Sequence, residues 1–307
     1  MKTLPPFTLV SRLENIRRLD PPAGAVRTLV NAAVRPRWLR DILHGVPLGH
    51  PLHPVMVQLP LGVWTSAAVL DALPAEWVPG SDRAAAALIG LGLAAAGPSA
   101  LAGYVDFSEL HEQQQRVGVV HSTANLIAVG LYAGSLYRRL AGGPDARGAG
   151  AGKPGAGKRL GFLGLAVVLA GGWLGGHLAF RQAVGANHAE DVPHRIHPGW
   201  HPLVNMDALV PGRMERRVLD SVPLLVLRTA RDEVHVLSDV CSHLSGPLHE
   251  GTLRRINGVE CVECPWHGSV FSLESGDVVH GPATSPQPSF QTRVTDGTVE
   301  VCLPGAG

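Results

Sequence analysis

Four apolar segments in the first 180 residues constrain the fold of this chain more than any other feature of its sequence. Each is about twenty residues long, enough for a helix rising about 1.5 Å per residue to cross a hydrocarbon core about 30 Å thick. A bilayer offers no water to the backbone, so a spanning segment of this kind folds as a helix. The sequence therefore predicts a four-helix transmembrane bundle within residues 51–182. The segments are Val55–Leu73, Ala84–Tyr104, Val117–Tyr137 and Leu160–Phe180.

Proline and glycine positions predict how these helices bend and pack. Pro60 and Pro98 lie inside the first two segments, where the missing N–H and the ring favour a kink. The fourth segment contains two pairs of glycines four residues apart, a spacing that lets membrane helices approach closely. These glycines are Gly171, Gly172, Gly175 and Gly176.

Residues 1–50 are a basic amino-terminal tail rich in proline. Within it, Val26–Leu43 carries apolar residues at near-helical spacing opposite four arginines. That pattern is typical of a helix lying in the headgroup region of a membrane. A partly disordered cytosolic tail accounts for the same composition, and both interpretations stay open.

The overall charge excludes one class of partner. Lys and Arg number 26 and Asp and Glu number 25, so the formal net charge is +1 and gives no reason to propose nucleic-acid binding. The four apolar segments make the lipid bilayer an expected partner. The chain has only four cysteines and shows no secretory signal in residues 1–20, which fits a reducing compartment.

The periodicity changes after a linker rich in His and Pro, residues 183–203. From Val204 onward, short β-rich runs are separated by turn signals such as Asn257-Gly258 and Asp296-Gly297. This pattern predicts a small antiparallel β domain over residues 204–307. The chain is therefore expected to be multi-domain, with an all-α membrane bundle followed by an all-β domain.

Two short motifs in the β domain pair a cysteine with a histidine. They are Cys241-Ser242-His243 and Cys264-Pro265-Trp266-His267, separated by residues 244–263. Two thiolates and two imidazoles on turn-flanked loops are the ligand set of a Rieske [2Fe–2S] cluster. A structural zinc site with two Cys and two His ligands is the alternative.

This region resembles the Rieske family over residues 205–303, through the two motifs and the downstream Phe271, Gly276 and Gly281-Pro282-Ala283. The resemblance implies an antiparallel β-sandwich. It also implies that Cys241 and Cys264 hold one iron and that His243 and His267 hold the other. The residues expected to shape the loops around the cluster are Gly246, Pro265, Gly268, Ser269 and Pro282.

The chain departs from the pattern of high-potential Rieske proteins of quinol-oxidising complexes at three positions. Those proteins carry two further cysteines, joined in a disulfide, where this sequence has Gly246 and Trp266. They place a tyrosine hydroxyl near a ligating sulfur where this sequence has Phe271. Fewer hydrogen bonds to sulfur stabilise the reduced cluster less, so a lower, ferredoxin-like potential is expected.

The membrane half resembles a bacterial family of four-helix membrane proteins of unknown function. The resemblance covers residues 45–185 and rests on the motif His50-Pro51-Leu52-His53-Pro54 and the downstream helix histidines. Members of that family are also found fused to Rieske domains. The resemblance implies no established activity.

Ionisable residues in the predicted membrane helices are a second candidate site. Helices of a bundle alternate in direction, so the candidate residues are expected at one membrane face, from which the β domain also emerges. They could bind haem b, bind a quinone head group with Asp106 taking protons, or hydrogen-bond between helices. The candidates are His53, His121, His177 and Asp106.

These observations predict a membrane-anchored Rieske protein that transfers single electrons to or from a redox partner protein or the quinone pool. An alternative is a quinone- or haem-linked oxidoreductase whose bundle is catalytic, and another is a redox or iron sensor. Whether the chain is an enzyme stays open. The expected location is the bacterial cytoplasmic membrane, with the β domain in the cytoplasm because the disulfide cysteines are missing and no export signal is seen.

Overall fold

The structure is a computed structural model that describes residues 10, 12–74, 76–141 and 155–304. The first nine residues of the basic tail therefore lie outside the described residues. The chain forms two compact units. One comprises Met1–Val34 and Leu52–Val184, and the other comprises Arg35–Pro51 and Gly185–Gly307.

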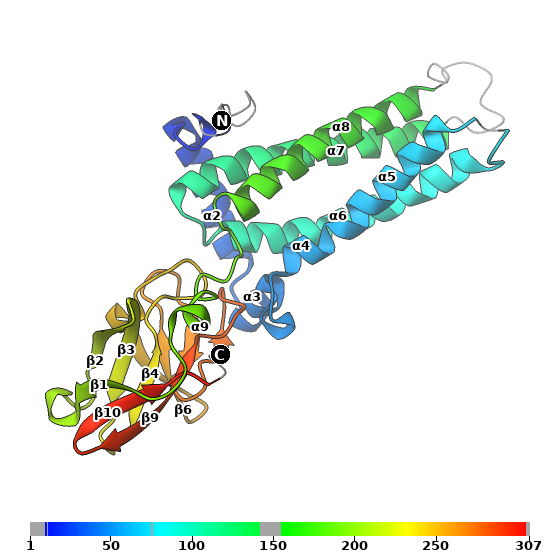
Figure 1. Cartoon of the computed structure of the whole chain (residues 1–307). Helices are drawn as coiled ribbons and strands as arrows, with labels where there is room; N and C mark the ends of the chain where they lie inside the picture. Colours follow the sequence, from blue (N-terminus) through cyan, green and yellow to red (C-terminus); the bar gives the residue numbers. More distant parts are fainter. Residues whose placement is uncertain (1–9, 11, 75, 142–154, 305–307) are drawn as a thin grey trace. The chain divides into compact units, whose positions relative to one another are not determined.

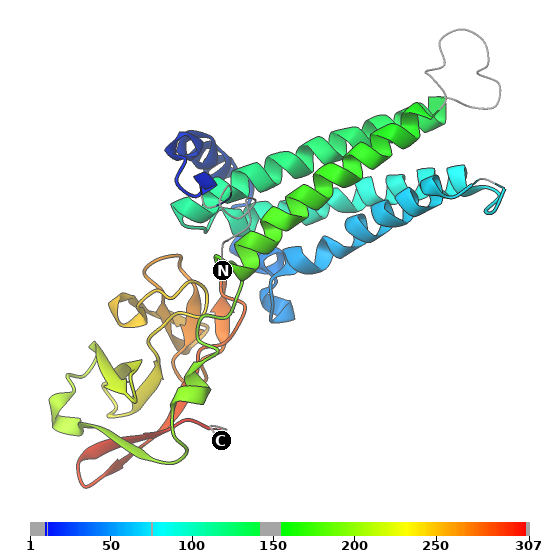
Figure 2. The same cartoon turned by 45° about the horizontal axis from the view of Figure 1, so that its top comes forward.

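The first unit contains the four apolar helices that the sequence predicts, each long and apolar enough to cross a membrane. Helices α5 to α8 run alongside one another in Figures 1 and 2. Neighbouring helices in sequence pack together, and α5 also packs on α8. The bounds are α4 Leu52–Met56, α5 Gln58–Ala72, α6 Ser81–Phe107, α7 Glu112–Ala141 and α8 Ala156–Phe180.

The first apolar segment is divided into α4 and α5 at Val57. Pro60 explains the break, because it has no N–H to donate to the carbonyl of Met56 and its ring clashes with that carbonyl. Pro98 lies inside α6, which continues through it. The break at Val57 agrees with the prediction for Pro60, and the kink at Pro98 stays a prediction.

Small residues let the helices of the bundle approach, as the glycine spacing predicts. Side chains of α7 lie directly over two glycines of α8: a Cβ on Gly171 would lie 2.7 Å from Asn125 Oδ1, and one on Gly175 would lie 3.1 Å from His121 Cε1. Deeper in the bundle, the rings of Trp64 and Tyr132 stack with centroids 4.2 Å apart. His121, Asn125 and Tyr132 are four and seven positions apart, so one face of α7 carries these contacts with the neighbouring helices.

The amino-terminal tail corrects one expectation. A single helix over Val26–Leu43 is wrong: α2 (Asp20–Ala33) ends before Pro36, and α3 (Arg37–His44) begins after it. Proline cannot continue the hydrogen-bond pattern and disfavours helical geometry at the residue before it. Helix α2 packs on α6 and α7 in the membrane unit, whereas α3 belongs to the other unit.

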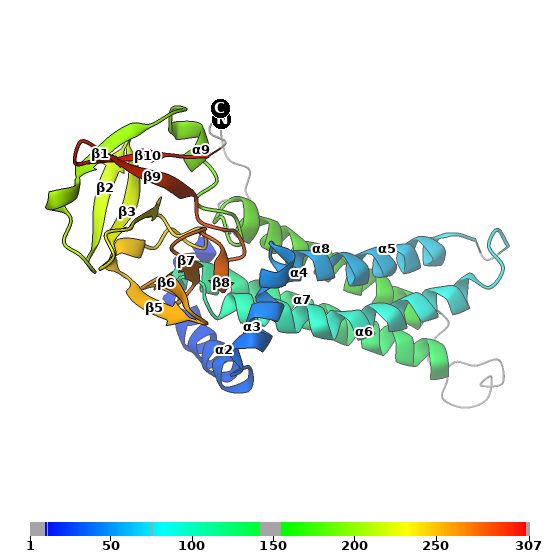
Figure 3. The same cartoon turned by 90° about the horizontal axis from the view of Figure 1, so that it is seen from below.

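The second unit is built on two antiparallel sheets, labelled in Figure 3. The six-stranded sheet has the order β1-β10-β9-β4-β3-β2, and the four-stranded sheet has the order β5-β6-β7-β8. The strands are β1 His201–Asn205, β2 Met214–Leu219, β3 Val222–Arg228, β4 Val234–Ser238, β5 Thr252–Ile256, β6 Val259–Glu263, β7 Val270–Ser272, β8 Val278–His280, β9 Ser289–Thr295 and β10 Thr298–Cys302.

Turn residues fix the hairpins of these sheets. Asn257 and Gly258 both have positive φ between β5 and β6, as do Asp296 and Gly297 between β9 and β10. Two consecutive left-handed residues form the two-residue turn whose twist matches the flanking strands. The predicted all-β domain and its turn signals are thus confirmed.

The core of this domain extends further toward the amino terminus than expected. Ala189, Val192 and Ile196 are buried among the residues of the six-stranded sheet. The helix α9 (Val192–Arg195) lies in the same stretch. Part of the segment expected as a linker, residues 183–203, therefore packs as part of the β domain.

Candidate metal centre

The two Cys/His motifs lie on loops that repeat the same backbone hydrogen bonds. The N–H of Cys241 donates to the carbonyl of Gly246 at 2.9 Å, and the N–H of Cys264 donates to that of Ser269 at 2.8 Å. Each cysteine carbonyl accepts from the residue four positions later, which has positive φ in both loops: Ser245 at 64° and Gly268 at 71°. The two loops therefore present their cysteines in equivalent ways.

Both cysteines point into the core between the two sheets. Cys241 and Cys264 are 1% and 3% exposed and pack with Phe271 and other apolar residues. The hydrogen bond between the two thiols raises the pKa of Cys241 and lowers the pKa of Cys264 to about 7. The two sulfur atoms thus lie within hydrogen-bonding reach of each other.

The two histidines lie beside each other on the outer side of the cysteines. The ring centroids of His243 and His267 are 5.1 Å apart with the rings nearly perpendicular, and both residues are partly exposed. The structure therefore brings together all four residues that the sequence singled out, with thiols inward and imidazoles outward.

Gly246 leaves room for the sulfur of Cys264. A Cβ at this position would lie 2.7 Å from Cys264 Sγ and 3.2 Å from the ring of Trp266. Gly246 and Trp266 thus lie next to each other, and the indole packs where related proteins are expected to carry a disulfide. All four cysteines of this chain are free thiols.

Gln287 is a loop-holding residue that the sequence analysis missed. Its side chain is 2% exposed, accepts from Ser242 N–H at 2.9 Å, and donates to the carbonyls of Ser238 and Val240 at 2.9 and 2.6 Å. It therefore ties the first motif to the end of β4. Its contacts are 45 to 49 positions away in sequence, and no local pattern marks it.

The structure brings together two of the membrane histidines. The rings of His53 and His121 have centroids 6.4 Å apart. Their Nδ1 atoms lie 2.9 Å from the Ser99 carbonyl and 2.7 Å from the Gly171 carbonyl, and Asn125 Nδ2 lies 3.2 Å from His121 Nε2. These contacts correspond to the interpretation in which the histidines hydrogen-bond between helices. Haem and quinone binding stay predictions.

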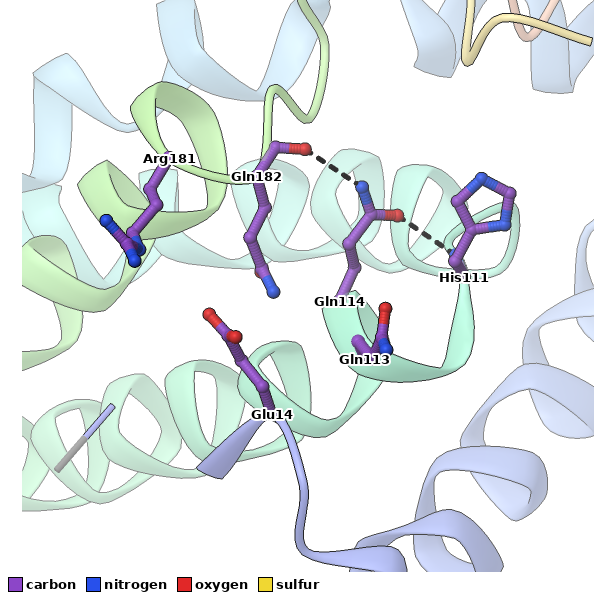
Figure 4. Close-up of a pocket in the computed structure, with 6 residues that line it drawn as sticks. All are labelled: Glu14, His111, Gln113, Gln114, Arg181 and Gln182. Carbon is purple, nitrogen blue, oxygen red and sulfur yellow. Dashed lines mark hydrogen bonds between the residues drawn. The ribbon is translucent and has the colours of Figure 1, made fainter. Parts of the chain in front are cut away.

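His177 lies apart from that pair, buried and 2.7 Å from the carboxylate of Glu14. Glu14 also lines a polar pocket of about 400 Å³, shown in Figure 4. In that pocket Gln114 donates to the Gln182 carbonyl and accepts from the His111 N–H, each at 3.0 Å. Asp106 is partly buried near the end of α6.

Comparison with known proteins decides the family. A model described as "Rieske [2Fe-2S] domain" matches residues 199–291, and one described as "Predicted membrane protein (DUF2231)" matches residues 49–188. The anthranilate 1,2-dioxygenase ferredoxin subunit of Burkholderia cepacia is 35% identical over 102 residues, 33% of this chain and 90% of that protein. The chain belongs to the Rieske family.

Other relatives of the Rieske domain are also ferredoxins. Ferredoxin CarAc of Metapseudomonas resinovorans is 32% identical over 103 residues, which are 33% of this chain and 92% of that protein. A solved complex of reduced oxygenase and oxidized ferredoxin in carbazole 1,9a-dioxygenase contains a chain that is 30% identical, covering 34% of this chain and 92% of that one, with a TM-score of 0.29. The Rieske domain implies a [2Fe–2S] cluster, and the amino-terminal half adds a membrane domain.

Proposed function

We propose that this Rieske protein is a membrane-bound carrier of single electrons, with Cys241 and Cys264 on one iron and His243 and His267 on the other. The observation that carries the proposal is the convergence of two buried thiols and two partly exposed imidazoles on two loops of one domain. When bound, a [2Fe–2S] cluster accepts and returns one electron. Its redox partner is a protein of the kind served by ferredoxins or the quinone pool.

The residues present fit such a cluster better than a single metal ion. Among the residues that the structure describes, no three His, Cys, Asp or Glu side chains gather as a one-metal site requires. A structural zinc ion takes four ligands around one point. A two-iron cluster instead takes two ligands at each end, which fits thiols packed in the core and imidazoles beside each other outside it.

The chain's own residues supply three further conditions for electron transfer. The apolar core around Cys241 and Cys264 keeps water from the sulfur side. The exposed sides of His243 and His267 leave a short path from the site to a partner. Gln287 and the paired loop hydrogen bonds hold the ligands in place, so little rearrangement accompanies a change of charge.

Substitution of one thiol tests the ligand assignment. We expect Cys241→Ser to remove nearly all bound iron and the Rieske EPR signal, because an alcohol does not replace a thiolate as an iron ligand here. Cys302→Ser is the matched control, since Cys302 lies at the end of β10 and is expected to leave the cluster intact. Iron analysis and EPR of the detergent-purified protein measure both. Full iron content in Cys241→Ser would refute the assignment.

The potential of the cluster is expected to be ferredoxin-like. Phe271 packs with both cysteines and offers no hydroxyl to a sulfur, and the second loop carries the hydroxyl of Ser269. We therefore expect a midpoint in the lower half of the range of about −150 to +300 mV that Rieske centres cover. An EPR-monitored redox titration measures it, and a midpoint near the top of that range would contradict this expectation.

A further inference from the structure

The segment just before the first membrane helix belongs to the Rieske unit. Residues 35–51, which we call the clasp, contain α3 and a 3₁₀ helix, Val46–Leu48. Helix α3 ends at His44 and is capped by Gly45, whose φ of 93° lets its N–H bond to the carbonyls of Asp41 and Ile42. A helix of eight residues is not stable alone, so its contacts with the domain hold it.

Asp41 binds the last residue of β8 and the residue after it, one with each carboxylate oxygen. Oδ1 accepts from the N–H of Gly281 at 3.0 Å, and Oδ2 lies 2.9 Å from Nδ1 of His280. The Asp41 side chain is 15% exposed, so these bonds are largely shielded from water. Figure 3 shows α3 beside β8. The contact is close, because a Cβ on Gly281 would lie 2.9 Å from Val46 Cγ2.

The segment held by Asp41 is bonded in turn to the second ligand loop. Two residues after Gly281, the N–H of Ala283 donates to the buried Ser269 Oγ at 3.0 Å. The carbonyl of Ser269 accepts the N–H of Cys264. A short series of hydrogen bonds therefore connects Asp41 to the backbone of a ligand residue.

A second side chain of the clasp reaches the same loop directly. Arg37 Nη2 donates to the carbonyl of Gly268 at 2.8 Å, one residue after His267. Arg37 and Asp41 are four positions apart and so lie on one face of α3. One face of α3 thus contacts both the second ligand loop, at Gly268, and the neighbouring segment at His280 and Gly281.

We propose that the clasp is part of the cluster site and that Asp41 is its positioning residue, setting both the retention of the cluster and its potential. This inference rests on the proposed function of the four ligands. Bonds to a charged carboxylate are stronger than neutral ones and hold the Gly281–Pro282 segment against the ligand loop. A fixed negative charge in the same domain disfavours addition of an electron to the cluster, which lowers the reduction potential of the cluster. The loops also exclude water from the cluster, and this exclusion lowers the same potential.

The test uses the full-length protein in detergent, with Asp41→Ala, Asp41→Asn and Glu274→Gln. Asp41→Ala loses charge and bonds, Asp41→Asn keeps the shape without the charge, and Glu274→Gln removes an exposed carboxylate of the same domain. We expect both Asp41 variants to titrate at a more positive midpoint. After a chelator is added, the visible absorption of the cluster is expected to disappear roughly tenfold faster in Asp41→Ala than in the wild type.

The outcomes separate this inference from the proposed function. A wild-type midpoint and loss rate in Asp41→Ala would overturn the role of the clasp, as would an equal shift in Glu274→Gln. If Asp41→Ala does not accumulate, the midpoint of Asp41→Asn decides the question. A wild-type protein without a Rieske EPR signal would instead remove the proposed function itself.

Discussion

Gly246→Ala is expected to lose most of its cluster while the rest of the chain keeps its structure. The new Cβ would meet Cys264 Sγ at 2.7 Å and the Trp266 ring at 3.2 Å. The sulfur cannot retreat freely, because the backbone of Cys264 is bonded to Ser269 and Gly268. Overpacking of this kind costs about 1–3 kcal/mol, which lowers cluster occupancy by roughly fivefold or more under limiting iron.

A second glycine of the same domain supplies the control for Gly246→Ala. Gly258 has a φ of +86° in an open turn, and asparagine tolerates that conformation. Gly258→Asn is therefore expected to retain the wild-type iron content. Iron analysis, EPR and circular dichroism of both purified variants make the comparison. Full iron content and an unchanged EPR spectrum in the Gly246→Ala variant would show that the close approach is not required.

Arg139→Ala is expected to give the largest loss of stability in the membrane unit. The guanidinium of Arg139 on α7 pairs in bidentate fashion with Asp71 on α5, and the two side chains are 9% and 2% exposed. Removing the arginine leaves a buried carboxylate without its cation, which costs about 3–5 kcal/mol. Thermal unfolding of the detergent-purified protein measures the effect.

Two variants show whether the buried charge causes that loss. Arg138 is the neighbouring cation and is exposed, so Arg138→Ala is expected to unfold near the wild-type temperature. Adding Asp71→Asn to Arg139→Ala removes the uncompensated charge and is expected to restore part of the stability. Equal unfolding temperatures for the Arg138 and Arg139 variants would contradict a role for the buried pair.

The parts of this molecule that were predictable are those determined by residues close together in the sequence. The spans follow from the length of apolar segments, and the ligand loops follow from motifs in which Cys and His are two or three positions apart. The break between α2 and α3 was predictable in principle from Pro36. It was missed because the apolar spacing on both sides fits one continuous helix.

The contacts that were not predictable join residues far apart in sequence. Asp41 and His280 are separated by 239 positions, and Glu14 and His177 by 163. No periodicity or spacing rule relates such residues, because only the tertiary fold brings them together. The same holds for Gln287, whose buried amide lies in an otherwise irregular segment between β8 and β9.

The division of the Rieske unit into two separate pieces of chain has a consequence for biosynthesis. The clasp is translated before the membrane helices, but the sheets it packs on are translated after residues 52–184. The residues that Asp41 and Arg37 contact in the folded domain, His280, Gly281 and Gly268, are therefore synthesised only after the bundle. A ribosome that stops after the fourth membrane helix leaves a chain that already carries the clasp but none of the strands on which it packs.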